Sequence, residues 1–376
     1  MNAMMRSRAG MALPMVLGAI TLIGTLIAGV MYVATQDYRV GANTLNETRA
    51  EAAAEMGVNR VLQDWDRTKN TTMAIGDTTR MLYTDPSGAS VNVLITRVGG
   101  PFFWAVSEAQ TRGNSLQYGA RRRFGSLLRL NTPNVNFLGA VTAAGNIRVS
   151  GNVSVNGNDA NPSGWSCSNA LTNMPGSVIT PTATTTVNGS VTINGNPPYT
   201  TSTAAGDTNT YFNYGGSTYT TLAAQANVTL TGGTYNGMAP AVTGTTCNVS
   251  ATTNWGDPVR HSPAAPCESY FPIIHVTGNL TASGGTGQGI LLVDGDLTKS
   301  GNFSFYGIVI ARGTIRSTGN NNGVTGVEMA AAVDLGDAVT LAGSTTIQYS
   351  SCAVMQALAA PSYLAVAKRR PWVNLY

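Results

Sequence analysis

Two carboxylates in the segment VDGDL are the residues that most readily suggest chemistry. Asp294 and Asp296 are two positions apart, so in a β-strand both side chains would point to one face. Such a pair could serve as general acid and base or bind calcium. However, the segment belongs to a phrase repeated along the chain, in which Gly, Asn and Asp occupy turns, and the distal glutamate of a calcium loop is missing. The sequence therefore favours a turn over a site.

Other catalytic patterns also lack support in the sequence. The run GGTGQG, Gly284 to Gly289, is not a phosphate loop, because Lys299 and Ser300 come a whole strand later than that pattern requires. A polysaccharide-cleaving β-helix would display several charged groups along one groove, and no Ser-His-Asp arrangement is supported beyond the residue types. The candidates for such a groove are Asp294, Asp296, Lys299, Arg312 and Arg316. We therefore expect no enzyme activity, no cofactor and no small-molecule substrate.

The four cysteines suggest disulfides rather than a metal site. They are Cys167, Cys247, Cys267 and Cys352. Four cysteines allow three pairings, and the sequence does not choose between them. We favour Cys247–Cys267, which closes a short loop. Zinc is disfavoured because the histidines are only His261 and His275 and there is no C-x-x-C pair.

An apolar stretch near the amino terminus organises the chain. Residues 11–34 are 24 residues without a charge, and a bilayer core needs roughly 20 in a helix. Arg6 and Arg8 precede the stretch, and the next charge is Asp37. The positive-inside rule then predicts a single-pass inner-membrane protein with its carboxy-terminal part in the periplasm, where disulfides persist. A cleaved secretory signal or a buried core helix is the alternative, but the stretch is too long and too apolar for either.

The apolar stretch continues into an amphipathic segment. Val58, Val61, Leu62 and Trp65 are spaced i, i+3, i+4 and i+7, which predicts one helical stripe facing a sheet. The alanines at positions 50 and 52–54 favour helix.

The leader RSRAG followed by MALPMVLGAITLIG resembles the class III leader of type IV pilins and pseudopilins. The resemblance implies cleavage between Gly10 and Met11 by a prepilin peptidase, with methylation of the new amino terminus. Major pilins carry glutamate at the fifth mature position, whereas this chain has Met15. PilX-type minor pilins also lack this glutamate, and the segment EAAAEMGVNRVL is similar to the alanine- and glutamate-rich stretch of their amino-terminal domain. The resemblance covers about residues 6–66.

Composition indicates an exported β-rich protein. Only 11% of the 376 residues are charged, and between Ala160 and Asp257 the only charged side chain is Asp207. The net charge of +4 is dispersed and does not indicate nucleic acid as a partner. Residues 81–130 alternate as antiparallel strands and contain Arg121, Arg122 and Arg123, which we expect on a solvated strand edge or, less plausibly, in a basic patch.

Beyond residue 131, phrases such as NVSVNGN and NLTASGG recur irregularly, a pattern typical of β-solenoid rungs with long insertions at 161–185 and 197–244. A helix at 353–359 could cap the open end, and the basic residues from Lys368 would begin a solvated tail. The predicted fold is α+β. Its parts are a leader (1–10), a transmembrane and amphipathic helix (11–66), a small antiparallel β region (67–130), a β-solenoid-like domain (131–352) and a cap and tail (353–376).

The leading functional hypothesis is a minor pilin-like structural component of a type IV pilus or related type II secretion filament. It would prime assembly or contact surfaces at the filament tip. Its expected partners are the inner membrane, other pilins, pilus assembly proteins and the prepilin peptidase. The alternative is a β-helical adhesin or envelope-binding protein that stays tethered to the inner membrane outside any filament.

Overall fold

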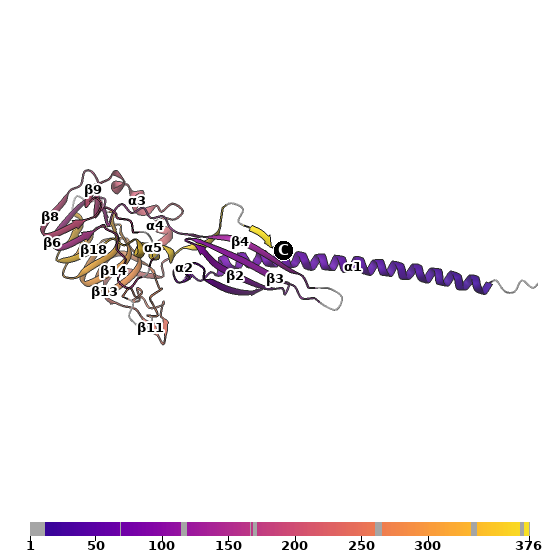
Figure 1. The fold of residues 1–376 in the computed structure, drawn as a ribbon. Helices are drawn as coiled ribbons and strands as arrows, with labels where there is room; N and C mark the ends of the chain where they lie inside the picture. The colour runs from indigo at the N-terminus through magenta and orange to yellow at the C-terminus, as the bar shows by residue number, and fades with distance from the viewer. Residues whose placement is uncertain are drawn as a thin grey trace, which may run out of the picture. The chain divides into compact units, whose positions relative to one another are not determined.

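A computed structural model describes residues 12–67, 69–113, 119–165, 167, 171–259, 265–331, 337–368 and 372–375. The chain forms two compact units (Figure 1). The first comprises residues 1–64, 75–129 and 366–376, and the second residues 65–74 and 130–365. The larger unit is therefore inserted into the smaller one.

One uninterrupted helix dominates the first unit. Helix α1 (Ala12–Asp64) has 53 residues, about 80 Å at 1.5 Å per residue. The only proline, Pro14, lies in the first turn, where a missing backbone N–H does not break a helix. By length and composition α1 could cross a membrane: its most apolar 18-residue window has a mean hydropathy of 2.2 and no residue buried inside the structure.

A small antiparallel sheet covers the second half of α1. Its strands are β1 (Thr78–Thr84), β2 (Ser90–Gly99), β3 (Phe102–Gln110), β4 (Arg121–Asn131) and β20 (Trp372–Leu375). Within this unit they pair in the order β1-β2-β3-β4-β20. Helix α1 packs on β2 and β3 (Figure 1). A long amino-terminal helix with an antiparallel sheet is thus confirmed.

The face that α1 buries is made of smaller residues than the sequence suggested. Ala50, Ala53, Ala54, Val58 and Val61 are each at most 1% exposed. Leu62 is only half-buried. Trp65 follows the helix and belongs to the second unit, where its indole N–H donates to Asn70 Oδ1 at 2.7 Å. Leu62 and Trp65 therefore differ from Val58 and Val61: Leu62 is only partly buried, and Trp65 is buried but lies beyond the end of the helix.

Gly57 explains how closely helix and sheet approach. A Cβ atom at this position would lie 2.3 Å from Ser107 Oγ and 2.6 Å from Val91 Cγ1. Such distances are far inside van der Waals contact, so only glycine fits against β2 and β3 without a shift. Small residues are the reason that the helix axis can lie against the sheet here.

The three consecutive arginines are strand residues, as predicted, and Arg121 and Arg122 lie outside the part of β4 that pairs with β20. Arg121 and Arg123 form ion pairs with Glu108 on β3 at 2.5 and 2.6 Å, whereas Arg122 points the other way and pairs with Glu47 of α1. Strand β4 has β3 on one side and β20 on the other, so Arg123 lies between two strands. The segment expected to be a solvated tail supplies β20.

Parallel strands stacked in register form the body of the second unit (Figure 1). The main stacked strands are β10 (Val228–Met238), β13 (Ile273–Val293), β14 (Leu297–Ala311), β15 (Ile315–Ser317), β16 (Asn322–Ala330), β17 (Asp337–Leu341), β18 (Ser344–Gln348), β6 (Asn146–Asn156) and β8 (Thr185–Asn194). The first residues of β14 pair with β15 and its later residues with β16. Strand β15 pairs with β17 and β16 with β18, and both β17 and β18 pair with β6. The pairings of β14, β15, β17, β6, β18 and β16 therefore close a ring, and β8 pairs with the outer side of β6. A mainly β domain is confirmed.

The remaining elements are shorter. They are α2 (Lys69–Thr72), β5 (Val141–Ala143), β7 (Ser177–Ile179), β9 (Tyr199–Thr201), the 3-10 turn η1 (Thr203–Gly206), α3 (Thr208–Phe212), α4 (Tyr219–Ala223), β11 (Val242–Thr243), β12 (Thr246–Cys247), α5 (Ser351–Ala359) and β19 (Tyr363–Val366). Strands β5, β7 and β9 extend the parallel stack from β16, in that order. The Thr/Asn-rich insertion is ordered where the structure describes it. Its Tyr211, Tyr214 and Leu222 are buried in the main core cluster.

Helix α5 does not cap the stack. It contacts β13, β14 and β16, which are neighbours in the stack, and therefore lies along their side. A column of glycines, Gly289, Gly307 and Gly326, runs through these strands with φ of +104°, +133° and +141°. A Cβ on Gly307 would lie 2.1 Å from the carbonyl oxygen of Gly289 and 3.1 Å from Ala357 of α5. Glycine thus allows both the bend and the close approach of the helix.

Candidate functional site

The residues tied to leader processing lie at one end of α1. Gly10 and Met11 are outside the described residues. Met15 is described, and its side chain is 71% exposed. Other large apolar side chains of this half are also exposed, including Leu17, Ile20 and Leu26. Exposed apolar surface on this scale normally indicates contact with lipid or with another protein. This half of α1 is the first candidate functional element.

The hydroxyl groups of Thr21 and Thr25, in this apolar half, are hydrogen-bonded within the helix. Thr21 and Thr25 donate their hydroxyl groups to carbonyl oxygens three or four residues earlier, at 2.9–3.0 Å. Their polar atoms are therefore satisfied inside the helix, which an apolar environment requires.

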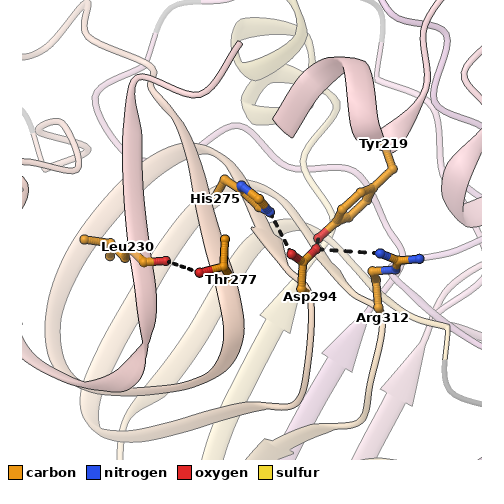
Figure 2. A network of polar contacts seen from close by, with 6 residues as sticks. All are labelled: Tyr219, Leu230, His275, Thr277, Asp294 and Arg312. Atoms are coloured by element: carbon orange, nitrogen blue, oxygen red, sulfur yellow. Dashed lines mark hydrogen bonds and ion pairs between the residues drawn. The ribbon is translucent and has the colours of Figure 1, made fainter. Parts of the chain in front are cut away.

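The second candidate is a polar cluster around Asp294. The Tyr219 hydroxyl of α4 donates to Asp294 Oδ1 at 3.0 Å, and His275 Nε2 of β13 lies 3.0 Å from Oδ2 (Figure 2). The Arg312 guanidinium approaches Oδ1 to 3.9 Å and lies over the rings of Phe212 and Tyr219 at 5.3 and 5.5 Å. Figure 2 also shows Thr277 on the same face, donating to the Leu230 carbonyl of the neighbouring strand β10 at 3.3 Å.

The electrostatics of the cluster keep Tyr219 protonated. Burial, followed by the neighbouring Asp294 charge, raises the pKa of Tyr219 well above its ordinary value. Tyr219 therefore remains a donor to Asp294. The side chains of Asp294 and His275 are 30% and 14% exposed. Among the described residues, no Ser, Thr or Cys side chain is hydrogen-bonded to His275. The cluster holds α4 and α3 against the stack.

Asp294 and Asp296 do not converge on one ligand. Asp296 Oδ1 accepts from the Thr314 N–H and hydroxyl at 2.7 and 2.9 Å. Asn279 Oδ1 accepts from the Asp296 N–H, and Asn146 Oδ1 from the Thr184 N–H, both at 2.9 Å. Asn and Asp thus connect each rung to the next at a turn, the role that the repeated phrase indicated.

Lys299 is not on a groove. It is 0% exposed, and its Nζ lies 2.5 Å from Oε1 of Glu328, which is also 0% exposed. Within the part of the chain that the structure describes, Glu328 Oε2 has no hydrogen-bond partner. The sequence carries no sign of this burial, because lysine and glutamate are almost always exposed.

The cysteines form two disulfides, Cys167–Cys352 and Cys247–Cys267. The first lies beside a small core cluster of Trp165, Phe271 and Ala353. Among the described residues, no group of three or more His, Cys, Asp or Glu side chains could hold a metal ion. His261 is outside them.

Comparisons with known proteins give little further guidance. No family model matches the chain, and no curated protein matches it. Among solved structures, the competence-associated pilin ComZ from Thermus thermophilus aligns at 10% identity over 88% of this chain and 98% of that chain, with a TM-score of 0.25. A TM-score this low carries no argument about fold or activity. The function must therefore be argued from the chain itself.

Proposed function

We propose that the chain is a pilin-like subunit of a type IV pilus or of a related type II secretion filament. One observation carries the proposal: α1 is continuous, its first half is apolar and exposed, and its second half packs on an antiparallel sheet. A helix of this kind can anchor a precursor in a membrane and then pack against equivalent helices in a filament core.

The remaining features support a periplasmic, minor subunit. Two disulfides form in oxidising compartments such as the periplasm. Met15 stands where the major subunits carry a glutamate. The inserted unit of residues 130–365 is too bulky to be carried by every subunit along a filament. We propose a place at or near the tip, in assembly priming or surface contact. The parallel stack is then a β-solenoid head, each rung burying its inward side chains against the next.

The test compares two neighbouring substitutions in the native host. Gly10→Val should block removal of the leader and keep the full-length chain in the membrane fraction, whereas the matched control Ala9→Val should be shortened and recovered with sheared filaments. A shortened, filament-associated Gly10→Val protein would refute the proposal. A wild-type chain that is never shortened and never found with filaments would instead favour the tethered adhesin.

A further inference from the structure

Strand β8 ends the branch of the parallel stack that runs through β6, and it has an open edge, whereas the other branch continues through β5 and β7 to β9. It pairs with β6 over ten consecutive residues, from Ile147–Thr185 to Asn156–Asn194, without a register shift. Among the described residues no strand lies on its other side. Most of its residues are exposed, in contrast to the inner strands. The outer backbone N–H and C=O groups of β8 are therefore available to another strand.

The hydrophobic core is also open at this edge beside Val187, whereas Val191 and Ile193 are partly buried against it. Val187, Val191 and Ile193 are in register with Val149, Val153 and Val155 of β6, which are at most 2% exposed. Val187 itself is 49% exposed. Solenoid ends are normally covered by a polar capping repeat. Helix α5 does not cover this end, because it lies along β13, β14 and β16.

The usual protections of an edge strand are missing from β8. It contains no charged residue and no proline, and its pairing shows no bulge. At the opposite end of the stack, β10 has a register shift between Thr231 and Gly233, and the Tyr235 hydroxyl donates to the Thr231 carbonyl at 2.8 Å. Strand β10 thus bonds part of its own edge, whereas β8 does not.

We propose that β8 pairs with β8 of a second copy of this chain, antiparallel and centred on Gly189. In this register Val187 faces Val191 of the other copy and Thr185 faces Ile193. All four side chains lie on the inward face, so each copy closes the open core of the other. An uncharged edge suits an identical uncharged edge, because a charged partner strand would bury a charge without a counterion.

The small area buried between the two β8 strands limits the affinity of the dimer. Two ten-residue strands bury much less than the roughly 1,200–2,000 Å² of a stable interface, so the pairing is weak in dilute solution. It becomes significant where copies are concentrated, as on one membrane. The pairing does not depend on the proposed filament role.

Sedimentation velocity of the detergent-solubilised full chain tests the pairing. Wild-type protein should show a concentration-dependent dimer. Val187→Lys, which places a charge two residues from the centre of the contact and opposite Val191, should weaken the dimer about tenfold or more. Thr229→Lys, an exposed residue on the β10 edge, is the matched control and should dimerise like wild type. Association through α1 would be equally strong in all three proteins and would overturn the proposal.

Hydrogen exchange of wild-type protein gives a second readout that needs no variant. Amides of residues 185–194 should gain protection when protein concentration rises from well below to well above the dissociation constant, while β10 amides should not change. A wild-type chain that stays monomeric, or protection that rises equally at both ends of the stack, would contradict the pairing.

Discussion

The buried pair Lys299–Glu328 is the residue-scale feature with the largest expected effect on stability. Both side chains are 0% exposed, and Lys299 crosses from the first residues of β14 to reach Glu328 on β16. An ion pair in this position costs desolvation on both sides, so the pair adds little net energy, whereas removal of one partner leaves a buried charge uncompensated.

Double-mutant analysis tests this role. Lys299→Met leaves the Glu328 carboxylate buried without a cation and should cost about 3–5 kcal/mol of unfolding free energy. Lys299→Met/Glu328→Leu should recover most of that loss, because both charges are gone. Urea denaturation of the wild type, Lys299→Met, Glu328→Leu and the double variant measures the coupling. Strictly additive losses would show that the two groups do not act as a pair.

At the same scale, Glu108 gives the first unit a pH dependence. Its hydrogen bond with Arg121, helped by Arg123, holds the pKa of Glu108 below its ordinary value despite partial burial. A carboxyl whose pKa is lowered by folding stabilises the fold above its unfolded pKa, and the contribution is lost as pH falls through the folded pKa. Local stability of β3 and β4 should therefore decline below about pH 4.5.

Local hydrogen exchange between pH 3 and 6 checks this expectation. Glu108→Gln should flatten the decline in β3 and β4. Glu55→Gln, on the exposed face of α1, is the control and should leave the wild-type profile in place. An unchanged profile in Glu108→Gln would show that the arginine contacts add nothing.

At the scale of elements, the packing of α1 on its sheet depends on Gly57. Gly57→Ala should cost about 1–3 kcal/mol of stability in the first unit, because Ser107 and Val91 must shift. Gly41→Ala is the matched control: its Cβ meets nothing within 4 Å, and alanine favours helix by roughly 1 kcal/mol. Thermal unfolding of both variants distinguishes the two effects. A neutral Gly57→Ala would mean that the contact is loose.

Which elements could be predicted depends on where their signal lies. Helix α1 and the alternating strands β2 and β3 are local patterns, and the sequence predicts them. The repeated Gly-Asn phrase likewise predicts stacked short strands. Three features have no local signal: the pairing of β6 with β17 and β18, just over 190 residues later, the position of α5 along the stack, and the return of β20 to β4. Each is decided by contacts between distant segments.

The site residues divide in the same way. Asp296 was predicted at a turn because the phrase repeats. The cluster of Tyr219, His275 and Arg312 around Asp294 unites residues of an insertion and three successive rungs, which no spacing in the chain indicates. Lys299 is buried because it is one of the alternate residues of β14 that face the core. Which alternate set faces the core cannot be assigned before the strand register is known.

At the scale of the whole molecule, the two disulfides should differ in how much they contribute to the free energy of unfolding. Cys167–Cys352 spans 185 residues and Cys247–Cys267 spans 20. In the chain-entropy model, loops of these lengths contribute about 5 and 3 kcal/mol. Replacing the first pair by serine should therefore lower the stability of the second unit more than replacing the second pair, by about 2 kcal/mol in chemical denaturation. The reverse order would show that local contacts outweigh loop closure.

The central claim is that the exposed, apolar half of α1 belongs to a processed pilin-like subunit. The most direct measurement is the intact mass and amino-terminal sequence of the protein recovered from membranes of its own host. The account predicts a chain that starts at Met11 and is heavier by one methyl group. A start at Met1, or at a residue beyond Ala34, would contradict it.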